Sequence, residues 1–222
     1  SDLDIGMNDW MIPAFEWDDN YVPDRGKVLG AEELEKMDKF YRYLDVDGDG
    51  IPYRTLPGVH PKGSYFTRGS GHTKYGNYTE DASAYQDVVD RLLVKWETAR
   101  GILPPADIRY SRFNSAAVLT VGSGNAACVE ALDRLAAQDV NLNYCRVRAF
   151  PFGDDVREFI AKHDVVYIVE QNRDAQLRTL LMLDVDADPT KLVSLLHYNG
   201  IPLNAGFVVD GVLDAISRGR AA

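Results

Sequence analysis

Residues 116–135 read AAVLTVGSGNAACVEALDRL and predict one strand–turn–helix unit. The first six residues are small or β-branched and apolar, as in a buried strand. A glycine-containing turn follows at 122–125, because glycine allows the positive φ that a sharp reversal needs. Val129, Leu132 and Leu135 then recur at helical spacing. A strand that passes through a short turn into a helix is typical of a parallel α/β sheet.

The residues after this unit continue the alternation of strands and helices. Strands are predicted at 142–150 and 165–169, and helices at 154–162, 175–183 and 189–198, followed by a last segment at 208–218. The apolar run 165–169 is typical of a parallel strand covered on both faces. Ligands or partners meet such sheets at the carboxyl edge. The residues predicted at that edge, or at a domain interface there, are Gly122, Ser123, Gly124, Asn125, Glu170, Gln171 and Asn172.

The first half of the chain is rich in loops and includes two predicted helices, at 31–44 and from 79 to 101. Leu103-Pro104-Pro105-Ala106 is the clearest linker, so a domain boundary is predicted between about 103 and 112. The predicted domains are 1–105 and 106–222. Because the first residue is Ser1, we expect the chain to be a piece of a longer protein.

Composition narrows the possible partners. The net charge of −10 argues against general binding to nucleic acid or to an anionic membrane, since both would repel the average surface. The sequence has no apolar run near the roughly 20 residues of a membrane span, and we expect a cytoplasmic protein. Cys128 and Cys145 are expected to be buried, and two thiols cannot supply the four ligands of an iron–sulfur cluster.

The acidic loop 45–50, DVDGDG, matches the opening of an EF-hand loop at Asp45, Asp47 and Asp49. The match ends there, because the twelfth position is Leu56 rather than a glutamate. An acidic surface turn is therefore the preferred interpretation, and we predict no metal site. A non-catalytic calcium or interaction module remains an alternative.

The glycine- and proline-rich stretch 51–78 offers the chemically interesting side chains of the first half. Polar groups on such loops are typical of ligand sites. The predicted substrate-proximal residues are Arg54, Thr55, Arg68 and His72. The alternative is that they tether loops at a subunit interface.

The turn at 122–127, GSGNAA, also fits the dinucleotide fingerprint G-x-G-x-x-A. An NADP-binding dehydrogenase module that uses Gly122-Ser123-Gly124 is thus an alternative, with Arg146 and Arg148 available to a 2′-phosphate. No acidic residue ends the second strand to bind a ribose. Ser123 is outside a G-x-S-x-G elbow. His163, expected at the surface, and His197, expected at a helix end, have no evident acid partner, which argues against a hydrolase.

Several motifs together resemble one family. They are VGSG (121–124), RAFPF (148–152), VEQN (169–172), AQLR (175–178), DGIPYRTLPG (49–58) and GHTKYG (71–76). The first four resemble the transketolase C-terminal-like second domain of the α subunit of 2-oxoacid:ferredoxin oxidoreductases, most similar to the 2-oxoglutarate enzyme. The last two resemble the stretch that joins its pyrimidine-binding domain to that second domain.

The resemblance implies a three-layer α/β domain preceded by the loop-rich end of a pyrimidine-binding domain. It implies oxidative decarboxylation of a 2-oxoacid, with 2-oxoglutarate as the expected substrate, to an acyl-coenzyme A, with electrons passed to ferredoxin. Thiamine diphosphate, Mg²⁺ and a [4Fe-4S] cluster would be held mainly by a β subunit in an α2β2 assembly, with coenzyme A as co-substrate. The catalytic residues would lie mostly upstream of Ser1 or in that partner.

Overall fold

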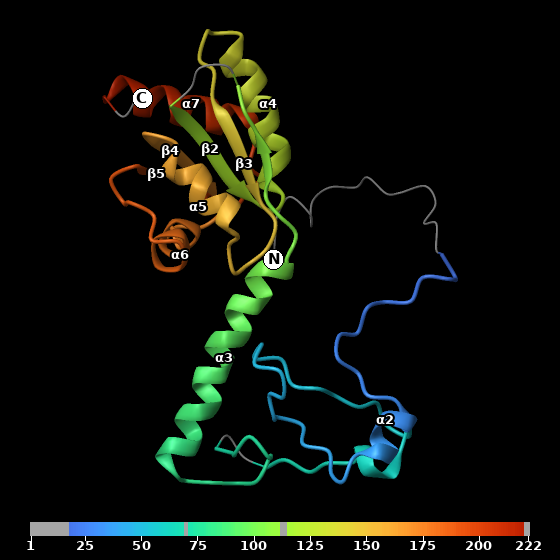
Figure 1. The fold of residues 1–222 in the computed structure, drawn as a ribbon. Helices are drawn as coiled ribbons and strands as arrows, with labels where there is room; N and C mark the ends of the chain where they lie inside the picture. Colours follow the sequence, from blue (N-terminus) through green and yellow to red (C-terminus); the bar gives the residue numbers. More distant parts are fainter. Residues whose placement is uncertain (1–17, 69–70, 112–114, 220–222) are drawn as a thin grey trace. The chain divides into compact units, whose positions relative to one another are not determined.

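The computed structural model describes residues 18–68, 71–111 and 115–219. These residues form two compact units, 18–102 and 103–219, which meet in the sequence between Ile102 and Leu103 (Figure 1). No helix in the described part of the chain is long and apolar enough to cross a membrane.

The second unit is built on a five-stranded sheet with the order β1-β3-β2-β4-β5. Its strands are β1 (Asp107–Arg109), β2 (Ala116–Val121), β3 (Asn143–Val147), β4 (Val165–Glu170) and β5 (Leu192–Leu196). The last four are parallel to one another, and only the edge strand β1 is antiparallel to its neighbour. The central strand β2 pairs with β3 on one side and β4 on the other, so its side chains are buried on both faces of the sheet.

Helices cover both faces of this sheet (Figure 1). On one face, α4 (Gly124–Ala136) and α7 (Ala205–Ser217) pack against Val118, Tyr144 and Tyr167. On the other face, α5 (Asp154–Ala161) and α6 (Gln176–Asp184) pack against Leu119, Cys145 and Ile168. Successive strand residues point to opposite faces, which explains why Val118 and Leu119 belong to different clusters. The predicted three-layer α/β fold with a mainly parallel sheet is confirmed.

The predicted helix at 189–198 is wrong, because residues 192–196 form β5. The strand pairs in register with β4, from Val166 opposite Leu192 to Glu170 opposite Leu196. Pro189 resembled the first residue of a helix, but it belongs to a turn in which Asp188 Oδ1 accepts a hydrogen bond from the backbone N–H of Thr190 at 2.8 Å. The short apolar run has no periodicity that separates strand from helix, and pairing with β4 decides between them.

The first unit has little regular structure. It contains α2 (Ala31–Lys36), the short 3-10 helix η1 (Pro61–Gly63) and the long helix α3 (Ala82–Ile102). The predicted helix at 31–44 is wrong beyond Lys36. Leu34 and Phe40 pack with Leu29 in a small core. Phe40 can reach this core because the helix ends at Lys36 and the chain continues without helical structure. The aromatic side chains after Phe40 instead meet the loop 65–78.

The long helix α3 confirms the helix expected from 79 to 101, with slightly shifted ends. Several of its apolar side chains stay accessible within the described chain. Leu92 is 46% exposed and Leu93 is 63% exposed. The helix nevertheless contacts the acidic loop closely, because a Cβ on Gly50 would lie 2.2 Å from the backbone nitrogen of Lys95. Gly50 has φ of +78° and can be replaced by no other residue without displacing this helix.

Candidate functional site

The carboxyl ends of β2, β3 and β4 meet at one edge of the sheet and form a cavity of about 580 Å³. This volume is in the range of small-molecule sites. The strand–turn–helix unit at 116–135 forms one wall, and the residues after β3 and β4 form the others. The predicted edge residues that line the cavity are Gly122, Gly124, Glu170, Gln171 and Asn172.

The glycine turn is shaped by packing rather than by an open cradle. Gly122 has φ of +63°, which favours glycine. A Cβ on Gly124 would lie 2.6 Å from Oγ1 of Thr120 and 3.5 Å from Cδ2 of Leu203. Thr120 is buried and donates to the carbonyl of Val169 at 2.9 Å. Gly124 therefore allows the helix to approach the strand, and the dinucleotide-binding alternative is not favoured.

Two side chains of this turn are held by neighbouring strands. Ser123 Oγ accepts a hydrogen bond from Nε2 of Gln171 at 3.1 Å, which joins the ends of β2 and β4. Asn125 Oδ1 accepts a hydrogen bond from the hydroxyl of Tyr144 at 2.8 Å. These contacts fix the start of α4 relative to the sheet, so this edge of the cavity is preformed.

Glu170, the last residue of β4, is 3% exposed and caps the next helix. Its carboxylate accepts hydrogen bonds from the backbone N–H groups of Leu177 at 2.8 Å and Arg178 at 3.3 Å. Asn172 assists, because its Oδ1 accepts from the backbone N–H of Gln176 at 3.2 Å. A helix N-terminus stabilises a carboxylate. Glu170 and Asn172 thus position α6, which is a structural task at the cavity wall.

Most of the remaining cavity wall is apolar. The side chains of Phe150, Phe152, Leu180 and Leu203 line it, with Arg148 beside them. Arg148 is exposed and has no hydrogen bond or ion pair to any other residue that the structure describes. Arg148 and Glu170 are the two charged residues among the described residues of the lining, and the charge of Glu170 is already directed at α6.

Arg54 and Thr55, predicted near a substrate, lie beside one another in the first unit. Arg54 Nη2 donates to the carbonyl of Arg25 at 2.6 Å, while its backbone pairs with Val28 in an isolated parallel bridge. Thr55 Oγ1 donates to the carbonyl of Gly63 at 2.8 Å. Arg54 remains exposed, so part of its guanidinium is accessible to solvent.

Arg68 and His72 lie on a different loop of the same unit. The guanidinium of Arg68 lies over the ring of Tyr78, 5.7 Å from its centroid, and His72 pairs with Tyr78 in an antiparallel bridge. The His72 ring stacks on Tyr43, with centroids 4.2 Å apart. The structure thus brings Arg68 and His72 near one tyrosine. Within the described chain, no hydrogen bond or ring contact connects them to Arg54 or Thr55.

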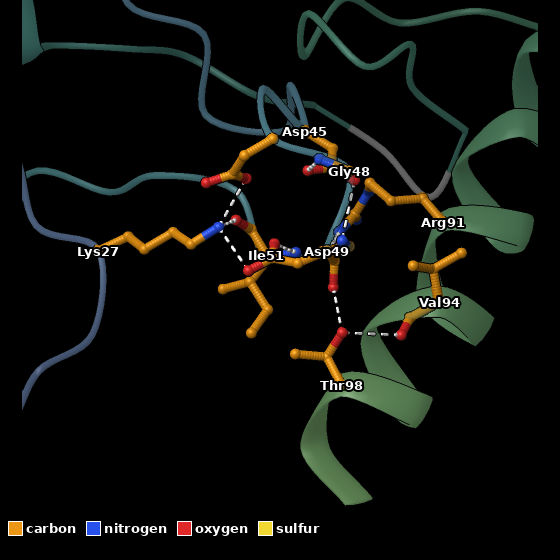
Figure 2. A network of polar contacts seen from close by, with 10 residues as sticks. Lys27, Asp45, Gly48, Asp49, Ile51, Arg91, Val94 and Thr98 are labelled. Carbon is orange, nitrogen blue, oxygen red and sulfur yellow. Dashed lines mark hydrogen bonds and ion pairs between the residues drawn. The ribbon is translucent and has the colours of Figure 1, made fainter. Parts of the chain in front are cut away.

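The side-chain ammonium of Lys27 lies against the carboxylates of the acidic loop 45–50 (Figure 2). One carboxylate oxygen from each of Asp45, Asp47 and Asp49 lies within 4.8 Å of the others. The ammonium of Lys27 contacts Asp47 and Asp49, each at 2.6 Å, and donates to the carbonyl of Ile51 at 3.2 Å. These groups correspond to the third, fifth and seventh positions of an EF-hand loop. Lys27 therefore supplies positive charge where such a loop binds calcium.

The acidic loop is also attached to α3. The hydroxyl of Thr98 donates to the carbonyl of Asp49 at 2.6 Å, and Nη1 of Arg91 donates to the carbonyl of Gly50 at 2.8 Å (Figure 2). Hydrogen bonds from Lys27 lower the pKa of Asp49 below its ordinary value, while the contacts with Asp47 and Asp49 raise the pKa of Lys27. Both shifts favour the charged pair.

In the second unit, the buried His163, Cys128 and Cys145 are structural groups. His163 is 1% exposed, so its expected surface position is wrong. Its Nδ1 lies 2.5 Å from the carbonyl of Phe159 and its Nε2 lies 2.8 Å from Nδ2 of Asn143, and burial lowers its pKa. Burial raises the pKa of Cys128 and of Cys145 to about 12, so neither is a thiolate at neutral pH.

Sequence reasoning did not identify the apolar walls of the cavity or the role of Lys27. Phe150, Leu180 and Leu203 look like ordinary core residues in the sequence, and only the fold brings them together. Lys27 precedes Asp47 by 20 residues, and no motif links the two. The sequence therefore gives no way to predict that Lys27 contacts the acidic loop.

Comparisons with known proteins give an extensive structural likeness. No protein-family model and no curated protein sequence matches the chain. The solved structure of 2-oxoglutarate:ferredoxin oxidoreductase from Magnetococcus marinus, with 2-oxoglutarate, coenzyme A and succinyl-CoA bound, aligns with a TM-score of 0.71 at 18% identity. The alignment covers 82% of this chain and 32% of that chain, so this chain spans about a third of that protein.

Two further solved structures align over about half of the chain. A split-gene transketolase, an inactive beta4 tetramer, has a TM-score of 0.43 at 17% identity, over 52% of this chain and 43% of its own. The alpha chain of a probable 2-oxoacid ferredoxin oxidoreductase from Thermoplasma acidophilum has a TM-score of 0.36 at 19% identity, over 51% of this chain and 97% of its own. Scores this low carry no argument about function. The likeness to the Magnetococcus protein shows that most of this chain shares the fold of part of a 2-oxoglutarate:ferredoxin oxidoreductase.

Proposed function

We propose that this chain is an α-subunit portion of a thiamine diphosphate-dependent 2-oxoacid:ferredoxin oxidoreductase, with 2-oxoglutarate as the 2-oxoacid. The observation that carries the proposal is the fold shared with 2-oxoglutarate:ferredoxin oxidoreductase over 82% of the chain. The motifs at 49–58, 71–76 and 148–152 support the same family. The proposed reaction converts a 2-oxoacid and coenzyme A to acyl-coenzyme A and carbon dioxide, with two electrons passed to ferredoxin.

The described residues do not fit the inorganic groups of that reaction. A [4Fe-4S] cluster normally requires four thiolates, whereas this sequence has two cysteines, both buried and with raised pKa. The carboxylates of the acidic loop already meet the ammonium of Lys27, which opposes a Mg²⁺ ion at the same oxygens. In the family that the motifs resemble, the β subunit carries the thiamine diphosphate. We therefore assign the cluster, Mg²⁺ and thiamine diphosphate to a partner β subunit.

In this proposal the chain supplies parts of two domains and one contribution to the substrate site. Its residues 106–222 form the transketolase C-terminal-like domain, and residues 1–105 form the end of the pyrimidine-binding domain. The loops at 51–78 contribute Arg54, or the neighbouring pair Arg68 and His72, to the carboxylates of the substrate. A guanidinium matches a carboxylate in geometry as well as in charge. Arg54 is suited to this because it is exposed and only one of its nitrogens is used by Arg25.

The decisive experiment is isolation of the protein from its native source with its bound partners. We expect a cysteine-rich partner, a brown colour, and reduction of ferredoxin that requires both 2-oxoglutarate and coenzyme A. The same preparation should be assayed with pyruvate and other 2-oxoacids to define the substrate. A chain that purifies without a partner and reduces NADP⁺ would contradict the proposal and support the dehydrogenase alternative.

A further inference from the structure

We propose that the cavity at the carboxyl edge of the sheet binds a small organic carboxylate, with its anionic group at Arg148 and its apolar body against Phe150, Leu180 and Leu203. The cavity has a volume of about 580 Å³, within the range of small-molecule sites.

The charges of the lining favour an anion. Arg148 and Glu170 are its charged members. Both oxygens of Glu170 accept backbone hydrogen bonds from the start of α6, so this carboxylate is committed to the helix. Arg148 has no hydrogen bond or ion pair within the part of the chain that the structure describes. A ligand that pairs with Arg148 therefore needs to break no contact within the described residues.

The walls favour an apolar body attached to that anion. Phe150 and Leu180, at the mouth of the cavity, are 43% and 39% exposed, and Leu203 lies deeper at 7%. A ligand that covers these side chains removes apolar surface from water, which is favourable. The described lining thus combines mainly apolar side chains with one cation, which is the usual composition of a small-molecule pocket.

The cavity suits a carboxylate better than a phosphate. A phosphate carries more charge and is usually bound by several cations or by an open loop of backbone N–H groups. Among the described residues that line the cavity, Arg148 is the one cation. One guanidinium can donate two parallel hydrogen bonds to a carboxylate.

The test is a titration of the full chain with hexanoate, followed by the amide NMR signals of the cavity. We expect saturable shifts at Gly122, Gly124 and Gln171, which line the cavity. Hexanamide, which has the same shape without the charge, and inorganic phosphate, which has charge without the apolar body, should each bind at least about tenfold more weakly. Arg148→Met should weaken hexanoate binding by about tenfold or more.

Two further variants separate the cavity from general charge effects. Arg134→Met is the matched control, because Arg134 is an exposed arginine on α4 that pairs with Glu130 outside the cavity, and hexanoate affinity should stay unchanged. Leu180→Glu places a negative charge at the mouth and should abolish binding even if Arg148→Met fails to fold. The proposal is overturned if hexanamide or phosphate equals hexanoate, if Arg148→Met binds normally, or if the cavity signals do not shift.

Discussion

The ammonium nitrogen of Lys27 lies 2.6 Å from Oδ2 of Asp49, inside a loop whose sequence resembles a calcium-binding loop. The contact brings together two parts of the first unit that are far apart in the sequence. It gives the acidic loop a counter-charge of its own and leaves the same oxygens less available to a metal ion.

Lys27→Met should lower the melting temperature, because the mutation removes the positive charge from two carboxylates and a carbonyl. We expect a loss of a few degrees, since exposed ion pairs contribute little. Lys36→Met is the control and should leave the melting temperature unchanged. Millimolar calcium should not stabilise the wild type. A clear calcium-dependent rise in its melting temperature would show that the ion displaces Lys27.

The stability of the second unit should fall as the pH decreases below about 6.5. Burial lowers the pKa of His163, so the folded protein prefers the neutral ring, whereas the unfolded chain takes up the proton at the ordinary value. The stabilisation is fully present above the unfolded pKa and is lost as the pH falls through the folded one. Chemical denaturation at a series of pH values measures this, and His163→Gln should flatten the profile between pH 7 and 5. An equally steep profile in the variant would exclude His163 as its source.

Gly124→Ala should destabilise the protein by about 1–3 kcal/mol, the usual cost of overpacking. The added Cβ would lie 2.6 Å from Oγ1 of Thr120. Thr120→Ala removes that atom, so the double variant should lose less stability than the sum of the single variants. Gly101→Ala is the control, because a Cβ there meets nothing within 4 Å. Additive effects in urea denaturation would mean that Thr120 is not what requires glycine at position 124.

Glu170→Gln should destabilise the second unit by about 1–2 kcal/mol, because the charged cap of α6 becomes neutral. The carboxylate of Glu170 is 3% exposed and accepts two backbone hydrogen bonds from that helix. Glu158→Gln removes an exposed pair with Lys162 and should change the unfolding free energy by no more than about 0.5 kcal/mol. Equal effects in the two variants would argue against the capping role.

Arg54→Ala should raise the Michaelis constant for 2-oxoglutarate by about tenfold in the assembled enzyme, because a charge-assisted hydrogen bond is lost. The turnover number should change less, since the expected contact is with the substrate rather than with the reacting atoms. Arg157→Ala, an exposed arginine on α5, serves as the control. An unchanged Michaelis constant would exclude Arg54 from the substrate site and direct the same test to Arg68 and His72.

The sequence by itself determined the elements that depend on local pattern. The apolar runs of β2 and β4, the glycine turn after β2 and the periodic helix α4 were all predicted, because each is encoded by neighbouring residues. Their order was enough to predict a parallel sheet and the edge at which Glu170 and the glycine turn come together. The long helix α3 was predicted for the same reason.

Only the tertiary structure decided the features that depend on residues far apart in the sequence. The segment at 192–196 becomes a strand because β4 offers it backbone partners, and α2 ends early because Phe40 is drawn into a small core. Gly124 is required by the side chain of Thr120, and the acidic loop receives Lys27. The cavity beside Arg148 is formed from several elements at once. Such contacts have no local periodicity, so packing and pairing in three dimensions determine them.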